Sequence, residues 1–145
     1  MIIRKAIVTD AQKIEHMVKD KKDKDNWLNP IGLKWQNFWV VEEKQTLIAC
    51  GQLRPWGKIK ELSSLTVLTS YRRKKIGTYL VQYLIQQTDT TIYLSCASNL
   101  KSFYNISGFK QISWSKIPNQ LKPEFGLSKM IATIRSKQLI FMKYQ

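Results

Sequence analysis

Residues 71–85, YRRKKIGTYLVQYLI, constrain the fold more than any other part of the chain. Four consecutive cations at positions 72–75 precede a single glycine, and apolar residues then recur at helical spacing: Ile76, Tyr79, Leu80, Tyr83 and Leu84. This spacing predicts a helix with one apolar face that packs on a sheet. The first turn of such a helix carries unpaired N–H groups and the positive end of the helix dipole, so we expect an anion to bind there.

Short β-rich runs surround this helix. NFWVVEE and TLIACGQL are separated only by KQ, which predicts a hairpin, and RPWGK then turns the chain into IKELSSLTVL. TTIYLSCA, KQISW and the final SKQLIFMKY predict three further strands. In IKELSSLTVL the apolar phase shifts between Leu62 and the pair Leu65 and Val67, which indicates a bulge.

Two more helices complete the pattern. After an N-terminal strand, a cap at Thr9 or Asp10 begins a helix with Ala11, Ile14 and Val18 on one face. NLKSFYNISGF predicts a short helix that Gly108 ends, with Leu100, Phe103 and Tyr104 on one side. Residues 19–29 fit a loop or a short helix that stops before Pro30. The element order predicts one domain over residues 1–145, an α/β or α+β fold with helices on a mixed sheet.

The charge is high and uneven. The chain has a formal net charge of +14, and residues 62–145 carry 12 Lys or Arg against only Asp89 and Glu124. This imbalance favours an anionic ligand. We do not expect a nucleic acid, because no zinc-finger spacing, arginine-rich repeat or aromatic RNA-binding signature accompanies the charge.

The cysteine pattern and the apolar runs bear on location. Cys50 and Cys96 lie in separate strand-like runs, which indicates reduced, buried thiols rather than a disulfide or a metal site. No run has the length of a membrane span, and the N-terminus lacks the pattern of a secretory signal. We therefore expect a cytoplasmic protein without a metal.

The basic segment has the chemistry of a pyrophosphate site. Arg72, Arg73, Lys74 and Lys75 bring positive charge to the helix start, Gly77 permits close approach to the backbone, and Thr78 adds a hydroxyl. Taken alone, the same segment also fits a solvated basic loop before an ordinary amphipathic helix.

Two segments of the chain resemble the GNAT superfamily of N-acetyltransferases in motifs, order and spacing. They are ELSSLTVLTSYRRKKIGTYLVQYLI and, after it, IYLSCASNLKSFYNISGFKQISW. The phosphate loop of that family, R/Q-x-x-G-x-G/A, corresponds to residues 72–77, with Lys75 in place of the first glycine. The second signature is the pair Phe103 and Tyr104 followed by Gly108 and Phe109. The resemblance covers residues 2–144 in element order.

This resemblance implies the fold, the cofactor and the reaction. It implies a mostly antiparallel twisted sheet with a V-shaped splay between its two central strands, in which acetyl-CoA binds as co-substrate. The backbone of Leu65, Thr66 and Val67 would then pair with pantetheine, and residues 72–78, including Ile76, would hold the phosphates. With Lys75 in the loop, we expect shifted phosphate contacts. Asn99 would hold pantetheine or serve as a helix N-cap.

The resemblance also implies catalytic roles. Tyr104 would protonate the departing thiolate of coenzyme A, and Glu61 would accept the proton of the attacking amine. The alternatives are core packing for Tyr104 and a surface carboxylate at a strand end for Glu61. An acetyl-enzyme on Cys96 is disfavoured, because the only histidine, His16, is distant in sequence.

The acceptor stays open. It is a primary amine of a small molecule or a protein, and GFKQISWSKIP is similar to a segment of family members that acetylate amino acids. Asp23 and Asp25 would suit a cationic acceptor, whereas four tryptophans fit either an acceptor pocket or the core: Trp27, Trp35, Trp56 and Trp114.

The other function class is a non-catalytic GNAT-like module that binds coenzyme A or nucleic acid. Dimers are common in the family, so a homodimer is compatible with the resemblance.

Overall fold

Seven strands form one mixed sheet in the order β1-β2-β3-β4-β5-β7-β6. The structure, a computed structural model, describes residues 1–20, 22–23 and 33–145. The strands are β1 (Ile2–Lys5), β2 (Phe38–Glu43), β3 (Thr46–Trp56), β4 (Ile59–Val67), β5 (Ile92–Ala97), β6 (Lys110–Ile112) and β7 (Leu139–Tyr144). The helices are α1 (Ala11–Val18), α2 (Ile76–Ile85), α3 (Lys101–Ile106) and α4 (Lys122–Ile134). The predicted α/β class with a mixed, mostly antiparallel sheet is confirmed.

The chain divides into two compact units. The first comprises Met1–Arg54 and Leu62–Thr88, and the second comprises Pro55–Glu61 and Asp89–Gln145. The single domain over residues 1–145 therefore stays a prediction. Among the described residues, no helix combines the length and the apolar character needed to cross a membrane.

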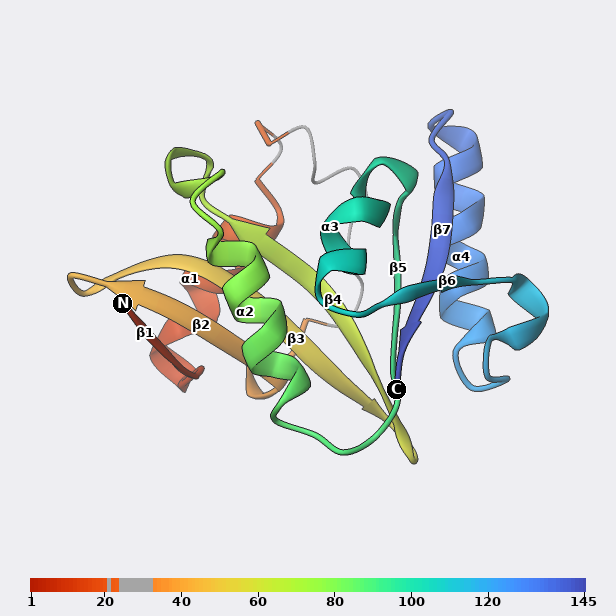
Figure 1. The fold of residues 1–145 in the computed structure, drawn as a ribbon. Helices are drawn as coiled ribbons and strands as arrows, with labels where there is room; N and C mark the ends of the chain where they lie inside the picture. The colour runs from red at the N-terminus through yellow and green to blue at the C-terminus, as the bar shows by residue number, and fades with distance from the viewer. Residues whose placement is uncertain (21, 24–32) are drawn as a thin grey trace. The chain divides into compact units, whose positions relative to one another are not determined.

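In the first unit, helices cover both faces of the antiparallel strands β1, β2 and β3 (Figure 1). On the α1 face, Ile14, Met17 and Val18 join a buried cluster with Phe38, Val40, Leu47 and Cys50. On the α2 face, an added Cβ at Gly51 would lie 3.1 Å from Leu65 and 3.4 Å from Leu84. Gly51 thus lets α2 lie close to the sheet.

The hairpin between β2 and β3 is confirmed, and its turn has an uncommon composition. Lys44 and Gln45 have φ angles of 50° and 64°. Both central residues of a type I′ turn need positive φ, and this turn matches the right-handed twist of the flanking strands. The sequence provides the two-residue loop without the usual Asn or Gly.

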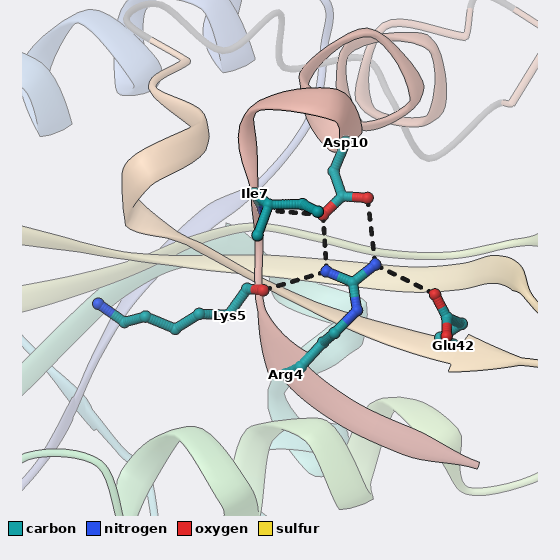
Figure 2. A network of polar contacts seen from close by, with 5 residues as sticks. All are labelled: Arg4, Lys5, Ile7, Asp10 and Glu42. Atoms are coloured by element: carbon teal, nitrogen blue, oxygen red, sulfur yellow. Dashed lines mark hydrogen bonds and ion pairs between the residues drawn. The ribbon is translucent and has the colours of Figure 1, made fainter.

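An ion-pair network links β1, the start of α1 and β2 (Figure 2). The Arg4 guanidinium donates to Asp10 at 2.7 and 3.2 Å and to Glu42 at 3.1 Å. Asp10 occupies the N-cap position of α1, as predicted, but its carboxylate accepts the Ile7 N–H at 2.8 Å instead of a helix amide. The hydrogen bond from Arg4 lowers the pKa of Asp10.

In the second unit, α3 and α4 lie on opposite faces of β5, β7 and β6 (Figure 1). Phe125 of α4 stacks on Phe141 of β7 with ring centroids 5.4 Å apart, within a cluster that includes Tyr93, Ile117 and Leu121. β4 enters this unit through parallel pairs of Lys60 with Ile92 and Glu61 with Tyr93. The predicted V-shaped splay between these two central strands is confirmed, and their parallel pairing is what makes the sheet mixed. The last strand pairs within the chain, between β5 and β6.

Three local predictions differ from the structure. α4 was not expected, although Pro123 near its start is a helix-initiation signal. Residues 54–56 continue β3, so the turn lies at Gly57 and Lys58 and not in RPWGK as a whole. In α2, Val81 is buried and Tyr79 is 49% exposed, because the apolar face is rotated from the one that the spacing predicted.

Candidate functional site

The basic loop before α2 has two residues in the left-handed region. After a 3-10 turn over Thr69–Tyr71, Arg73 and Lys75 both have φ of 63°. Lys75 is the N-cap of α2, with ψ of 14°. Non-glycine residues rarely adopt this conformation, which costs roughly 1–2 kcal/mol. Lys75 therefore keeps the backbone conformation that favours glycine and adds a cation.

The first turn of α2 presents the N–H groups that were predicted to bind an anion. The Tyr79 N–H donates to the Lys75 carbonyl at 3.0 Å, which closes the first turn. The amides of Ile76, Gly77 and Thr78 precede that bond, so the helix itself provides no acceptor for them. The Lys75 side chain makes no capping hydrogen bond, and no acidic residue lies in this turn. The helix start is therefore electropositive.

Arg72 anchors the loop. Its Nε donates to the Val67 carbonyl at 2.9 Å, and its guanidinium forms an ion pair with Asp23. Arg73, Lys74 and Lys75 are exposed, and Lys74 Nζ lies 5.4 Å from the centroid of the Tyr71 ring. The loop thus has one cation fixed to β4 and three at the surface. Asp23 makes an ion pair inside the first unit, whereas Asp25 and Trp27 lie outside the described residues.

β4 has the irregularity that its sequence pattern indicated. Ser64 has φ of 56° within the strand, the left-handed conformation found in some β-bulges. Thr66 is buried, and its hydroxyl donates to the Ser64 carbonyl at 3.4 Å. Leu65 packs toward Gly51, and the Val67 carbonyl already accepts Arg72. Pantetheine pairing by Leu65, Thr66 and Val67 stays a prediction.

Tyr104 is a buried phenol in an aromatic cluster of the second unit. Its ring lies 4.8 Å from Phe103 and 5.8 Å from Phe109, centroid to centroid, with both pairs in edge geometry. Burial raises the pKa of Tyr104, and the nearby Cys96 raises it further. The phenol is therefore protonated throughout the physiological range, as a hydrogen-bond donor to sulfur must be. The Phe103–Gly108 signature thus serves the core and keeps Tyr104 neutral.

Gly108 ends α3 as predicted. Its φ is 98°, and an added Cβ would lie 2.9 Å from the Tyr144 ring. The ring of Phe109 lies 5.6 Å from Tyr144. Gly108 is therefore required both by the backbone angle and by the close approach of β7.

Glu61 is buried, with 4% of its surface exposed. Its Oε1 accepts the indole N–H of Trp56 at 3.0 Å. The alternative of a solvated carboxylate at a strand end is wrong, because the side chain lies beneath the surface. The role of Glu61 as a base stays a prediction, and no local sequence pattern indicated its contact with Trp56.

The structure bears on two further predictions, the N-cap role of Asn99 and an acetyl-enzyme on Cys96. Asn99 is exposed in a 3-10 turn over Ser98–Leu100, and the N-cap of α3 is Leu100, so Asn99 is not the cap. Burial raises the pKa of the Cys96 thiol to about 12, which leaves a poor nucleophile at neutral pH. Within the described part of the chain, no group of three His, Cys, Asp or Glu is placed to hold a metal ion.

The tryptophans divide between the two units. Trp35 packs against the α1 cluster in the first unit. In the second unit, the Trp114 ring lies 5.6 Å from Phe141, and Trp56 packs against the α4 cluster. Core packing thus accounts for Trp35 and Trp56, whereas Trp114 is 36% exposed. Trp56 also donates to a candidate catalytic group.

Comparison with known proteins agrees with this description. Many solved structures share the fold, among them the following three. A Mycobacterium tuberculosis protein in complex with CoA and NLQ has a TM-score of 0.75 and 17% identity, over 99% of this chain and 98% of that one. N-acetylglutamate synthase from Neisseria gonorrhoeae, complexed with coenzyme A and N-acetyl-glutamate, has 0.75 and 14%, over 98% of this chain and 34% of its own. Ribosomal-protein-alanine N-acetyltransferase from Brucella melitensis has 0.69 and 16%, over 99% of both chains.

No curated protein matches the sequence significantly. A family model described as an acetyltransferase (GNAT) domain matches residues 34–111, which is more than half of the chain and includes β4, the basic loop, α2, β5 and α3. The chain therefore belongs to the GNAT acetyltransferase family.

Proposed function

We propose that the chain is an N-acetyltransferase that transfers the acetyl group of acetyl-CoA to a primary amine. One observation carries the proposal: in the loop before α2, Lys75 stands where the family pattern has a glycine and adopts the left-handed conformation that glycine favours. With this backbone conformation the helix start presents the amides of Ile76, Gly77 and Thr78. A loop of this shape and charge suits the phosphates of coenzyme A.

The proposed donor site is built on α2 and β4. The amides of the first turn of α2 hold the pyrophosphate, and the exposed Arg73, Lys74 and Lys75 add positive charge. Arg72 fixes the loop to the end of β4 through the Val67 carbonyl. The backbone of residues 65–67 and the side chain of Asn99 contact pantetheine.

The proposed chemistry is direct attack by a neutral amine on the thioester. Glu61 accepts the proton that the amine loses as the new C–N bond forms. The C–S bond breaks, and Tyr104 donates a hydrogen bond and then a proton to the coenzyme A thiolate. Direct attack fits the buried, protonated Cys96 better than an acetyl-enzyme.

The acceptor is proposed only as a primary amine. It belongs to an amino acid or another small molecule, or to a protein. The names of the structural neighbours include both an N-acetylglutamate synthase and a ribosomal-protein-alanine N-acetyltransferase, so they favour neither class.

The decisive experiment combines calorimetry with turnover. Acetyl-CoA is titrated into the wild type and Tyr104→Phe at physiological salt, and both are assayed against a panel of amino acids, polyamines and peptides. We expect both proteins to bind acetyl-CoA with equal affinity and kcat to fall about 100-fold in the variant, the lower range for a lost general acid. Tyr144→Phe is the matched control, because it removes a hydroxyl from the same aromatic cluster and should keep the wild-type rate.

Two results would contradict the proposal. Tyr104→Phe turning over at the wild-type rate would remove the assigned acid. Failure of the wild type to bind acetyl-CoA, together with salt-sensitive binding of a nucleic-acid oligomer run in parallel, would favour the non-catalytic module instead.

A further inference from the structure

The carboxylate of Glu61 is held by a residue from the preceding strand. Trp56 ends β3 and Glu61 is the third residue of β4, so the pair brackets the turn at Gly57 and Lys58. Trp56 Nε1 lies 3.0 Å from Glu61 Oε1. The contact is therefore formed within one hairpin, between side chains only five residues apart.

Trp56 is itself fixed by packing that does not involve Glu61. Its ring packs against the buried cluster that α4 forms with β5 and β7. Its carbonyl accepts the side-chain amide of Gln120 at 3.5 Å. The indole N–H thus projects from a ring that the core of the second unit holds in place.

The donor is suited to a carboxylate that must gain and lose a proton. An indole N–H donates only and does not titrate, so it fixes one oxygen and exchanges no proton with it. On the adjoining strands, Glu61 is in register with Tyr93, and Tyr93 with Lys143. Lys143 Nζ lies 5.9 Å from the centroid of the Tyr93 ring.

We propose that Trp56 is a positioning residue for Glu61 in acetyl transfer. The hydrogen bond to Oε1 sets the orientation in which the Glu61 carboxylate accepts the amine proton. This inference rests on the proposed function and adds to it a residue outside the two family signatures.

The first test is kinetic. Trp56→Phe keeps an aromatic ring for the α4 cluster but removes the N–H donor, together with part of the indole ring area. We expect kcat for amine acetylation to fall about tenfold, the effect of about 1.4 kcal/mol lost from the transition state. The KM for acetyl-CoA and the melting temperature should stay close to those of the wild type.

Trp39→Phe is the matched control. The Trp39 ring packs on Tyr83 in the first unit, so its substitution removes ring area and an indole N–H other than the one that donates to Glu61. Its kcat should equal that of the wild type. A Trp56→Phe enzyme with wild-type kcat would overturn the proposal, as would a Glu61→Gln enzyme with wild-type kcat.

The second test needs no acceptor. In a ¹⁵N-correlated NMR spectrum, the indole signal of Trp56 is identified as the one that Trp56→Phe removes from the five tryptophans. Glu61→Gln should move this signal more than the other four. An unmoved signal would overturn the positioning role even if the enzyme is active. A shifted signal in a protein that acetylates no amine would instead reject the proposed function, and the catalytic role of Trp56 with it.

Discussion

The two units stabilise their chain reversals by different means. In the first unit, Arg4 joins Asp10 to Glu42, and Arg72 ties the basic loop to Asp23. In the second unit, the contacts are between aromatic rings. Tyr104, Phe109 and Tyr144 pack around the end of α3, and Phe125 stacks on Phe141 beneath α4.

This difference has a physical consequence. Ion pairs depend on protonation and on salt, whereas ring packing depends on volume and shape. The stability of the first unit should therefore depend on pH through particular carboxylates. The stability of the second unit should fall when a single atom is added where its rings pack closely.

The largest expected effect is that of Gly108→Ala. The variant places a Cβ at a φ of 98° and 2.9 Å from the Tyr144 ring. Backbone strain and overpacking together should lower the free energy of unfolding by about 2–4 kcal/mol. Urea denaturation at several pH values measures this loss, which should not vary with pH.

Gly126→Ala is the control for Gly108→Ala. Its Cβ would lie 3.5 Å from Trp114, an ordinary contact, inside α4. Alanine should stabilise this helix by about 0.5–1 kcal/mol. If the two alanine variants lost equal stability, close ring packing at the end of α3 would not distinguish the second unit.

The next effect is that of Asp10→Asn. At neutral pH the variant loses the charge that Arg4 binds, which should lower the free energy of unfolding by about 1–3 kcal/mol. Because folding lowers the pKa of Asp10, its contribution is present above the unfolded pKa of about 4. The contribution is lost as the pH falls through the folded pKa.

The measurement is a series of urea denaturations from pH 7 down to pH 3. The difference between wild type and Asp10→Asn should shrink as the pH falls. The exposed Asp89, replaced by Asn, should show almost no difference at any pH. A constant gap between wild type and Asp10→Asn would mean that shape, and not charge, is what the network contributes.

The sequence predicted the parts of the fold that local patterns encode. Apolar, β-rich runs identified the strands. The apolar spacing after residue 75 identified α2, because burial on one face of a helix leaves a periodic signal. α4 was missed because only two of its residues are buried, Phe125 and Ala132, and they lie seven positions apart with Gly126 between them. Its helical state depends on packing against Phe141, which no local pattern encodes.

The same limit applies to the site. The loop and the pair Phe103 and Tyr104 were recognisable as motifs. The anchors of the site were not, because Asp23 lies 49 residues from Arg72, and the Trp56 indole meets Glu61 only across a hairpin turn whose position was predicted differently.

The smallest expected effect is that of Lys75→Gly. Lys75 and Gly108 both have positive φ, but Lys75 has 63° and an exposed side chain. Glycine relieves about 1 kcal/mol of left-handed strain and adds about as much entropy to the unfolded chain. The free energy of unfolding should change by less than about 0.5 kcal/mol. A loss as large as that of Gly108→Ala would show that the Lys75 side chain has a structural role.

The two buried cysteines make the chain convenient for site-specific labelling. Burial raises the pKa of both Cys50 and Cys96 to about 12, so at neutral pH neither thiol should compete for a maleimide. A cysteine introduced at any exposed position would then be the one reactive thiol in the folded protein. Fluorescent or spin labels could be attached to either unit without first replacing a core residue.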